Sequence, residues 1–151
     1  MDNFKVAKPQ FNVTVFNRVV FVTANKKFVQ ELLAFIQTCN SFCTDWSDFC
    51  DDMTQLIAES DDSTYHGGDY SVHRFRHVYT ISLENEAAED MSRRILEDAS
   101  YCCGKNKDIS LPTFVAFGRK LKDAAEGNYQ NLAPSNRGPI REIIVRREII
   151  R

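Results

Sequence analysis

Cysteine and histidine are the residue types in this sequence with the clearest capacity for metal binding or nucleophilic chemistry. Cys39 and Cys43 are one helical turn apart, and Cys102 is followed directly by Cys103. Structural zinc sites mostly use cysteine pairs two residues apart on turns, a spacing that this sequence lacks. Four of the five cysteines fall on apolar faces of predicted helices. We therefore expect reduced thiols packed as small apolar groups, and no metal site.

The histidines offer a second candidate for a metal or general-base site. His73 and His77 fall on the same face of a predicted strand, and His66 and Asp69 precede it in a polar loop. Four residues along a strand separate two side chains by about 13 Å, which is too far for both to bind one ion. Hydrogen-bonded imidazoles on a partly buried face are the simpler interpretation.

Motifs of known catalytic chemistry are missing from the sequence. It has no Gly-x-Ser-x-Gly nucleophile turn and no dinucleotide fingerprint, and the segment CCGKNK lacks the first glycine of a phosphate-binding loop. We therefore predict a protein that is not an enzyme and that uses no cofactor.

Charge is distributed unevenly, although the net charge is only −2. Residues 28–73 contain nine acidic residues and no Lys or Arg, whereas both flanking segments are basic. This division favours head-to-tail self-association or a charged partner. A candidate acidic face lies on the side of a predicted helix away from its apolar stripe: Asp45, Asp48, Asp52 and Glu59. A solvated surface is the simpler interpretation, and a surface that imitates nucleic acid or docks a basic partner is the alternative.

A basic and aromatic set is a candidate surface for single-stranded nucleic acid, in which rings stack on bases and cations contact phosphates. Its members are Arg74, Phe75, Arg76, Tyr79, Arg93, Arg94, Lys105, Lys107, Arg119, Lys120 and Lys122. Alternation along a predicted strand puts Phe75 and Tyr79 on the opposite face from the two arginines, which counts against this surface. An isoelectric point near 5.9 is also low for a general nucleic-acid binder.

The elements that must position these residues follow from hydrophobic periodicity. Runs of Val, Phe and Thr around Asn17-Arg18 predict a β-hairpin over residues 11–24. Apolar residues then recur three or four apart after the cap Asn25, which predicts one helix of about 33 residues. Such a helix would be about 50 Å long. We expect either a kink at the segment CTDWSD, capped by Thr44 or Asp45, or coverage of part of the stripe by another subunit.

A polar loop over residues 61–71 and one strand over residues 72–83 follow this helix in the predicted order. Two shorter helices come next, capped by Asn85 and Ser110. The fold class is therefore α+β, a small mostly antiparallel sheet packed on one long amphipathic helix and two shorter helices.

The chain divides at residue 127 on composition. We assign residues 1–127 to a single domain, and residues 128–151 to a linker and an extended C-terminal strand arm. The arm, IREIIVRREIIR, repeats REII at a spacing of six, which keeps equivalent side chains on one face of a strand. Its candidate contact residues are Ile140, Ile143, Ile144, Val145, Arg146, Arg147, Ile149 and Ile150.

An apolar strand with an uncovered edge is a hazard for uncontrolled pairing, so we expect the arm to pair with something. The patterns predict a non-enzymatic protein that associates with copies of itself or with a larger complex, by adding the arm as a strand to a neighbouring molecule. The arm is basic and residues 45–62 are acidic, so complementary charge would steer this contact. Pairing of the arm with the chain's own hairpin is the alternative.

Two other functions stay open at this point. The first is a single-stranded RNA- or DNA-binding module, and the second is an acidic-surface inhibitor or nucleic-acid mimic. The polar start and the absence of an apolar run of about 18 residues predict a cytoplasmic protein without membrane contact. A small, Phe-rich chain with few motifs also suits a viral or phage origin.

Overall fold

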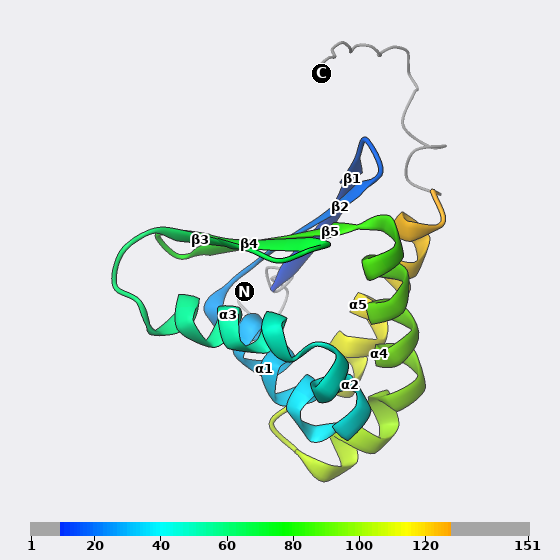
Figure 1. The fold of residues 1–151 in the computed structure, drawn as a ribbon. Helices are drawn as coiled ribbons and strands as arrows, with labels where there is room; N and C mark the ends of the chain where they lie inside the picture. Colours follow the sequence, from blue (N-terminus) through cyan, green and yellow to red (C-terminus); the bar gives the residue numbers. More distant parts are fainter. Residues whose placement is uncertain (1–9, 128–151) are drawn as a thin grey trace, which may run out of the picture.

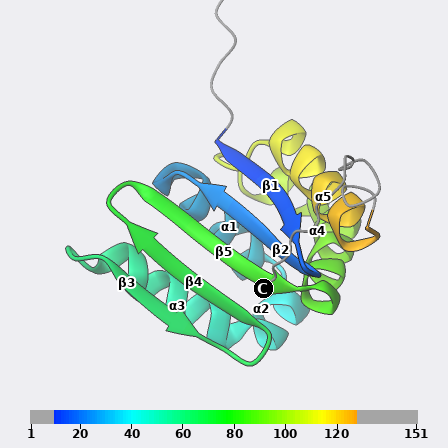
Figure 2. The ribbon, with the colours of Figure 1, turned by 90° about the horizontal axis from the view of Figure 1, so that it is seen from above.

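The computed structural model of this chain describes residues 10–127. It confirms the α+β class: a five-stranded antiparallel sheet in the order β1-β2-β5-β4-β3 has helices packed against one face, and no described helix covers the other face (Figures 1 and 2). The elements in chain order are β1 (Phe11–Phe16), β2 (Val19–Ala24), α1 (Lys26–Thr38), α2 (Asn40–Asp45), α3 (Ser47–Ala58), β3 (Ser63–His66), β4 (Tyr70–Phe75), β5 (Val78–Glu84), α4 (Asn85–Lys105) and α5 (Leu111–Ala125).

The predicted N-terminal hairpin is confirmed as β1 and β2, with Phe16 opposite Val19. Asn17 and Arg18 both take left-handed backbone angles, with φ of 54° and 68°. Two consecutive residues in this conformation form the usual turn of a two-residue hairpin loop, because the twist of this turn matches the twist of the paired strands. Asn tolerates this conformation well, and Arg18 adopts it although it has a Cβ atom.

The prediction of one long helix is wrong, because its apolar stripe runs over α1, α2 and α3. The chain leaves helical geometry at Cys39 and again at Trp46, so the expected kink lies near the segment CTDWSD. Neither Thr44 nor Asp45 caps it: both belong to α2, and no side chain caps the start of α3. A straight helix of about 50 Å would extend far past six-residue strands of about 20 Å, so the breaks keep the stripe on the sheet.

The stripe itself is buried as predicted. Phe28, Phe35 and Phe42 have no exposed surface, and Trp46 is 8% exposed. Rings from three elements meet around Phe28, whose centroid lies 4.9 Å from Phe11 and Phe117. The caps of α1 and α5 are also confirmed, since the side chains of Asn25 and Ser110 accept from backbone N–H groups of the first turn. The cap predicted at Asn85 is displaced by one residue, because α4 begins at Asn85 itself.

The prediction of one strand over residues 72–83 is wrong, because the chain reverses at Arg76 and His77 to form the hairpin of β4 and β5. Arg76 has a φ of 58°, which a strand does not adopt, and its N–H donates to Asp62. The alternation of faces restarts after this turn. Arg74 therefore lies opposite Tyr79, with its guanidinium 5.5 Å from the ring, and not on the other face as predicted.

Two further expectations are corrected. The predicted loop over residues 61–71 contains the edge strand β3, which pairs with β4. The structure also joins Cys39 at the end of α1 to Cys102 of α4 as a disulfide, against the expectation of five reduced thiols. Among the described residues, no helix is long and apolar enough to cross a bilayer.

Candidate functional site: an acidic aromatic cavity

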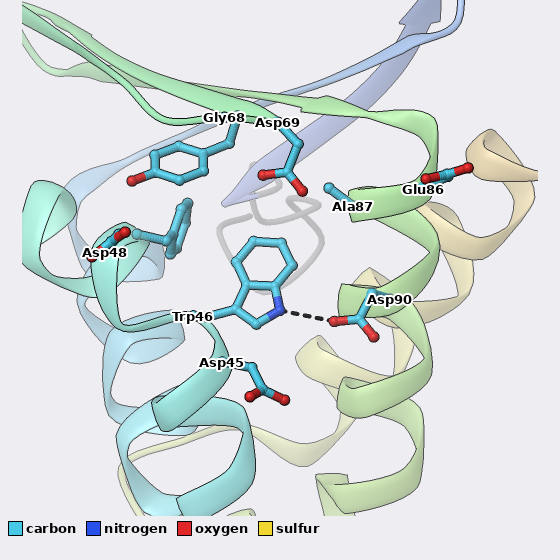
Figure 3. Close-up of a pocket in the computed structure, with 10 residues that line it drawn as sticks. Asp45, Trp46, Asp48, Gly68, Asp69, Glu86, Ala87 and Asp90 are labelled. Carbon is cyan, nitrogen blue, oxygen red and sulfur yellow. Dashed lines mark hydrogen bonds between the residues drawn. The ribbon is translucent and has the colours of Figure 1, made fainter.

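A cavity of about 320 Å³ lies under the turn between β3 and β4, where α2, α3 and α4 come together (Figure 3). We call it the acidic cavity, and it is lined by Asp45, Trp46, Asp48, Phe49, Gly68, Asp69, Tyr70, Glu86, Ala87 and Asp90. Half of these residues are carboxylates and three are aromatic. The cavity is thus assembled from three separate parts of the chain, residues 45–49, 68–70 and 86–90, and the order of the strands brings them together.

The aromatic side chains form one wall of the cavity. Trp46 and Phe49 meet edge to face with ring centroids 5.4 Å apart, and Phe49 meets Tyr70 at the same distance. Ring faces attract cations through their quadrupole, and nearby carboxylates attract them through their charge. The chemistry of the lining therefore favours a cationic group with a flat or apolar part.

One arginine already neutralises part of this lining. Arg94 on α4 donates from Nε to Asp90 at 2.8 Å and from Nη2 to Asp45, while its guanidinium lies 5.6 Å from the Phe42 ring. No side chain of the described part bonds the carboxylates of Asp48, Asp69 or Glu86. Those three acids hold the negative charge that a ligand would meet.

Trp46, the only tryptophan of the chain, is fixed at the back of the cavity by Asp90. Its Nε1 donates to Oδ2 of Asp90 at 2.9 Å, which ties the junction of α2 and α3 to α4 (Figure 3). Partial burial works against ionisation of Asp90, but hydrogen bonds from Trp46 and Arg94 outweigh it and lower the pKa of Asp90 below its ordinary value of 3.8. The ionised carboxylate is therefore part of the folded structure at neutral pH.

We expect Asp90→Asn to lower the free energy of unfolding by about 1–2 kcal/mol at pH 7, because charge-assisted hydrogen bonds to Arg94 are lost. A carboxyl whose folded pKa is depressed stabilises the protein above its ordinary pKa, and this contribution disappears as the pH falls through the folded value. The difference between wild type and variant should thus be constant above pH 5 and shrink below about pH 4. Urea unfolding followed by Trp46 fluorescence measures it.

The matched control is Glu97→Gln on the same helix, since Glu97 makes only a 3.6 Å contact with Arg93 and is 63% exposed. That variant should cost less than about 0.5 kcal/mol at any pH. A pH-independent loss for Asp90→Asn would contradict the role of its charge.

Tyr70 holds the turn of β3 and β4 over the cavity. Its hydroxyl donates to Asp52 of α3 at 2.6 Å, and burial together with that carboxylate raises the pKa of Tyr70. A side chain at Gly67 would overlap the Tyr70 ring, so glycine is required where the ring crosses the turn. Asp69 directly precedes Tyr70 and points into the cavity (Figure 3).

Only some residues of the predicted acidic face lie on the same surface. Asp45 and Asp48 line the cavity, and Asp52 lies behind its wall as the partner of Tyr70. Glu59 lies at the other end of α3, where it accepts from the hydroxyls of Ser63 and Tyr65, and these bonds lower its pKa. The predicted acidic face did not include the other carboxylates of the lining, Asp69, Glu86 and Asp90, because they come from the turn and from α4.

The candidate nucleic-acid residues are dispersed. Tyr79 is 1% exposed and cannot stack on a base, and Arg74 donates to the carbonyls of Leu56 and Glu59 at the end of α3. On α4, Arg93 contacts Asp90 and Glu97, and Arg94 is bonded to Asp45 and Asp90 of the cavity lining. The other members are Lys105 at the end of α4, Lys107 in the turn after it, and Arg119, Lys120 and Lys122 on α5.

Two members of that set do lie together. Phe75 is 53% exposed, and the guanidinium of Arg76 lies 5.4 Å from its ring. They occupy the turn of β4 and β5, at the opposite end of β4 from the acidic cavity.

Histidine and cysteine form no metal site in residues 10–127, where no three potential ligands gather. His77 lies in the turn after β4, so it does not share a strand with His73 as predicted. The Nδ1 atom of His73 is 2.6 Å from the hydroxyl of Thr64. Burial, followed by the charges of Cys43 and Asp51, raises the pKa of Cys50 to about 12, which keeps this thiol protonated and poorly nucleophilic.

The candidate residues of the C-terminal arm, Ile140 to Ile150, lie outside the described residues. Comparison with known proteins finds no matching family model, no similar curated protein and no similar solved structure. The acidic cavity must therefore be interpreted from its own chemistry.

Proposed function

We propose that this protein is a non-enzymatic self-associating protein in which the acidic cavity of one molecule receives a basic side chain from the C-terminal arm of another. The observation that carries the proposal is the cavity itself, with carboxylates and aromatic rings around one space. Residues 140–151 contain four arginines and two glutamates, so the arm has the opposite charge. Complementary charge of this kind sets which surfaces meet and how fast.

Arginine fits the cavity better than other side chains of the arm. Its planar guanidinium pairs with two carboxylate oxygens at once and stacks on aromatic faces, and the lining offers both. A volume of about 320 Å³ lies at the small end of ligand pockets and suits one large side chain. Arg146 and Arg147 are adjacent in the sequence, so an extended arm directs them to opposite sides and one of them faces the cavity.

We expect the full chain to have an apparent mass above that of one chain by light scattering after size exclusion, and the chain without residues 137–151 to have the mass of one. The assembly of the full chain should weaken as salt increases, because exposed charges are screened within about 10 Å at 0.1 M ionic strength. A mass of one chain both with and without the arm would contradict the proposal.

Single-strand nucleic-acid binding is the second candidate function, and the exposed pair of Phe75 and Arg76 favours it. A ring with a guanidinium beside it matches the stacking platforms of such proteins. Protein purified at low salt would then carry bound nucleic acid, detected as excess absorbance at 260 nm, and Phe75→Ala would lower this absorbance. An acidic inhibitor, the third idea, would bind a basic partner and have the mass of one chain when alone.

A further inference from the structure

The sheet has two edge strands, β1 and β3, and no strand of residues 10–127 pairs with the outer side of either, so another strand could pair there. In the hairpin of β3 and β4, the N–H of Gly67 donates to the carbonyl of Tyr70. Along an antiparallel ladder, a residue whose N–H and C=O point toward the partner strand alternates with a residue whose N–H and C=O point away from it, and Gly67 is of the first kind. The backbone N–H and C=O of Thr64 and His66 therefore point away from β4, toward the free side.

The same reasoning applies to the opposite edge. The N–H of Asn25 donates to the carbonyl of Gln10, and alternation from that bond turns the backbone groups of Phe11, Val13 and Val15 away from β2. Both edges are thus able to accept a strand, and charge decides between them.

The helices beside the two edges have opposite charge. α5 packs beside β1 and carries three cations, Arg119, Lys120 and Lys122, against one acid, Asp123. α3 packs beneath β3 and carries three acids, Asp48, Asp51 and Asp52, and no cation. An arm with four arginines and two glutamates is attracted to the β3 edge and repelled by the β1 edge.

We propose that the arm of a second copy adds as a sixth strand along β3, pairing with the outward backbone groups of Thr64 and His66. This inference rests on the proposed self-association and states where the backbone of the arm binds. Main-chain bonds would supply affinity, and the side chains facing α3 would supply specificity.

The position of β3 lets one arm reach both the edge and the acidic cavity. β3 leads directly into the turn that contains Gly68 and Asp69, two residues of the cavity lining. Twelve extended residues span about 40 Å, whereas the four residues of β3 span about 13 Å. An arm paired with β3 thus extends past the turn, where an arginine meets Asp69 and Asp48.

Two apolar side chains at this edge are also partly exposed to solvent. Tyr65 points inward from β3, and Ile57 lies on α3 below it; both are only half-buried although they pack against the core. Isoleucines of the arm that face the same way would cover them, which is the usual gain when a strand is added to an edge.

Proline substitution of the full chain tests this placement. His66→Pro removes an N–H that points away from β4, a position that edge strands tolerate, so the molecule should fold. We expect its apparent mass by light scattering to fall to one chain. The matched control is Val15→Pro at the β1 edge, which should leave the mass of the assembly unchanged. A full-size assembly of His66→Pro, with a loss for a folded Val15→Pro, would overturn the inference.

Hydrogen exchange of the unsubstituted chain gives a second measurement that does not depend on how a variant folds. The amides of Thr64 and His66 should exchange at least about tenfold more slowly in the full chain than in the chain without residues 137–151. Equal exchange rates overturn the placement at β3. Slow exchange in a particle of one chain also overturns it, because the chain's own arm then occupies the edge.

These results also separate the two proposals. If deletion of the arm reduces the mass to one chain while His66→Pro still assembles, and the amides of Thr64 and His66 exchange fast in the unsubstituted full chain, then the arm assembles the protein at another place. If neither change affects the mass, self-association through the arm fails altogether.

Discussion

Phe42→Ala should lower the free energy of unfolding by about 3–5 kcal/mol, the range for a large aromatic side chain removed from a full core. Phe42 has no exposed surface and is the only buried residue of the short helix α2. Its ring centroid lies 6.2 Å from Phe35 and 6.1 Å from Trp46, both edge to face. Its loss would leave a cavity and free α2 from the core, next to the Arg94 guanidinium.

Phe16→Ala is the matched control, since Phe16 is 64% exposed at the end of β1. The same truncation there should cost less than about 0.5 kcal/mol. Urea unfolding of both variants, with the slope against urea compared to wild type, measures the difference. A loss below about 1 kcal/mol for Phe42→Ala would mean that the apolar stripe is not packed as the structure has it.

Periodicity predicted the parts of the fold that depend on local sequence. The apolar stripe, the hairpin around Asn17-Arg18 and the caps Asn25 and Ser110 are each set by neighbouring residues, and the structure confirms them. The break at Trp46 falls in the segment CTDWSD, where a kink was one of the expectations, but the break at Cys39 was not placed, because neither Gly nor Pro marks it. Both breaks follow from the size of the sheet that the stripe must cover.

The second hairpin was missed for a related reason. Arg76 takes a left-handed backbone conformation in which glycine or asparagine is more common, so composition indicated an uninterrupted strand. This one error also put Arg74 on the wrong face. The edge strand β3 was missed because its Ser, Thr, Tyr and His residues are more polar than most strands and precede two glycines.

The acidic cavity also could be predicted only in part from local sequence. Uneven charge indicated an acidic surface, and two of the residues assigned to it, Asp45 and Asp48, line the cavity. Asp69 and Asp90 could be added only when the strand order β2-β5-β4-β3 set the turn of β3 and β4 above the start of α4. Contacts between elements far apart in the chain depend on topology, which local patterns do not specify.

The charge-exchange experiment has the largest expected effect on assembly. One variant, Asp48→Arg with Asp69→Arg, reverses the cavity charge but keeps its arm; neither carboxylate is bonded by a side chain of the described residues. The other, Arg146→Glu with Arg147→Glu, reverses the arm but keeps its cavity. Each alone should have the mass of one chain, because its arm and its cavity then carry charge of the same sign.

Light scattering of the two variants mixed in equal amounts tests most directly the claim that the arm of one molecule binds the acidic cavity of another. The mixture contains one native arm and one native cavity for each pair, and their contact is head to tail. The reversed arm and the reversed cavity are also complementary in charge, so we predict particles with the mass of two or more chains in the mixture and of one chain in each separate solution. If the mixture stays at one chain, or if either variant assembles alone as the wild type does, the cavity is not the receptor of the arm.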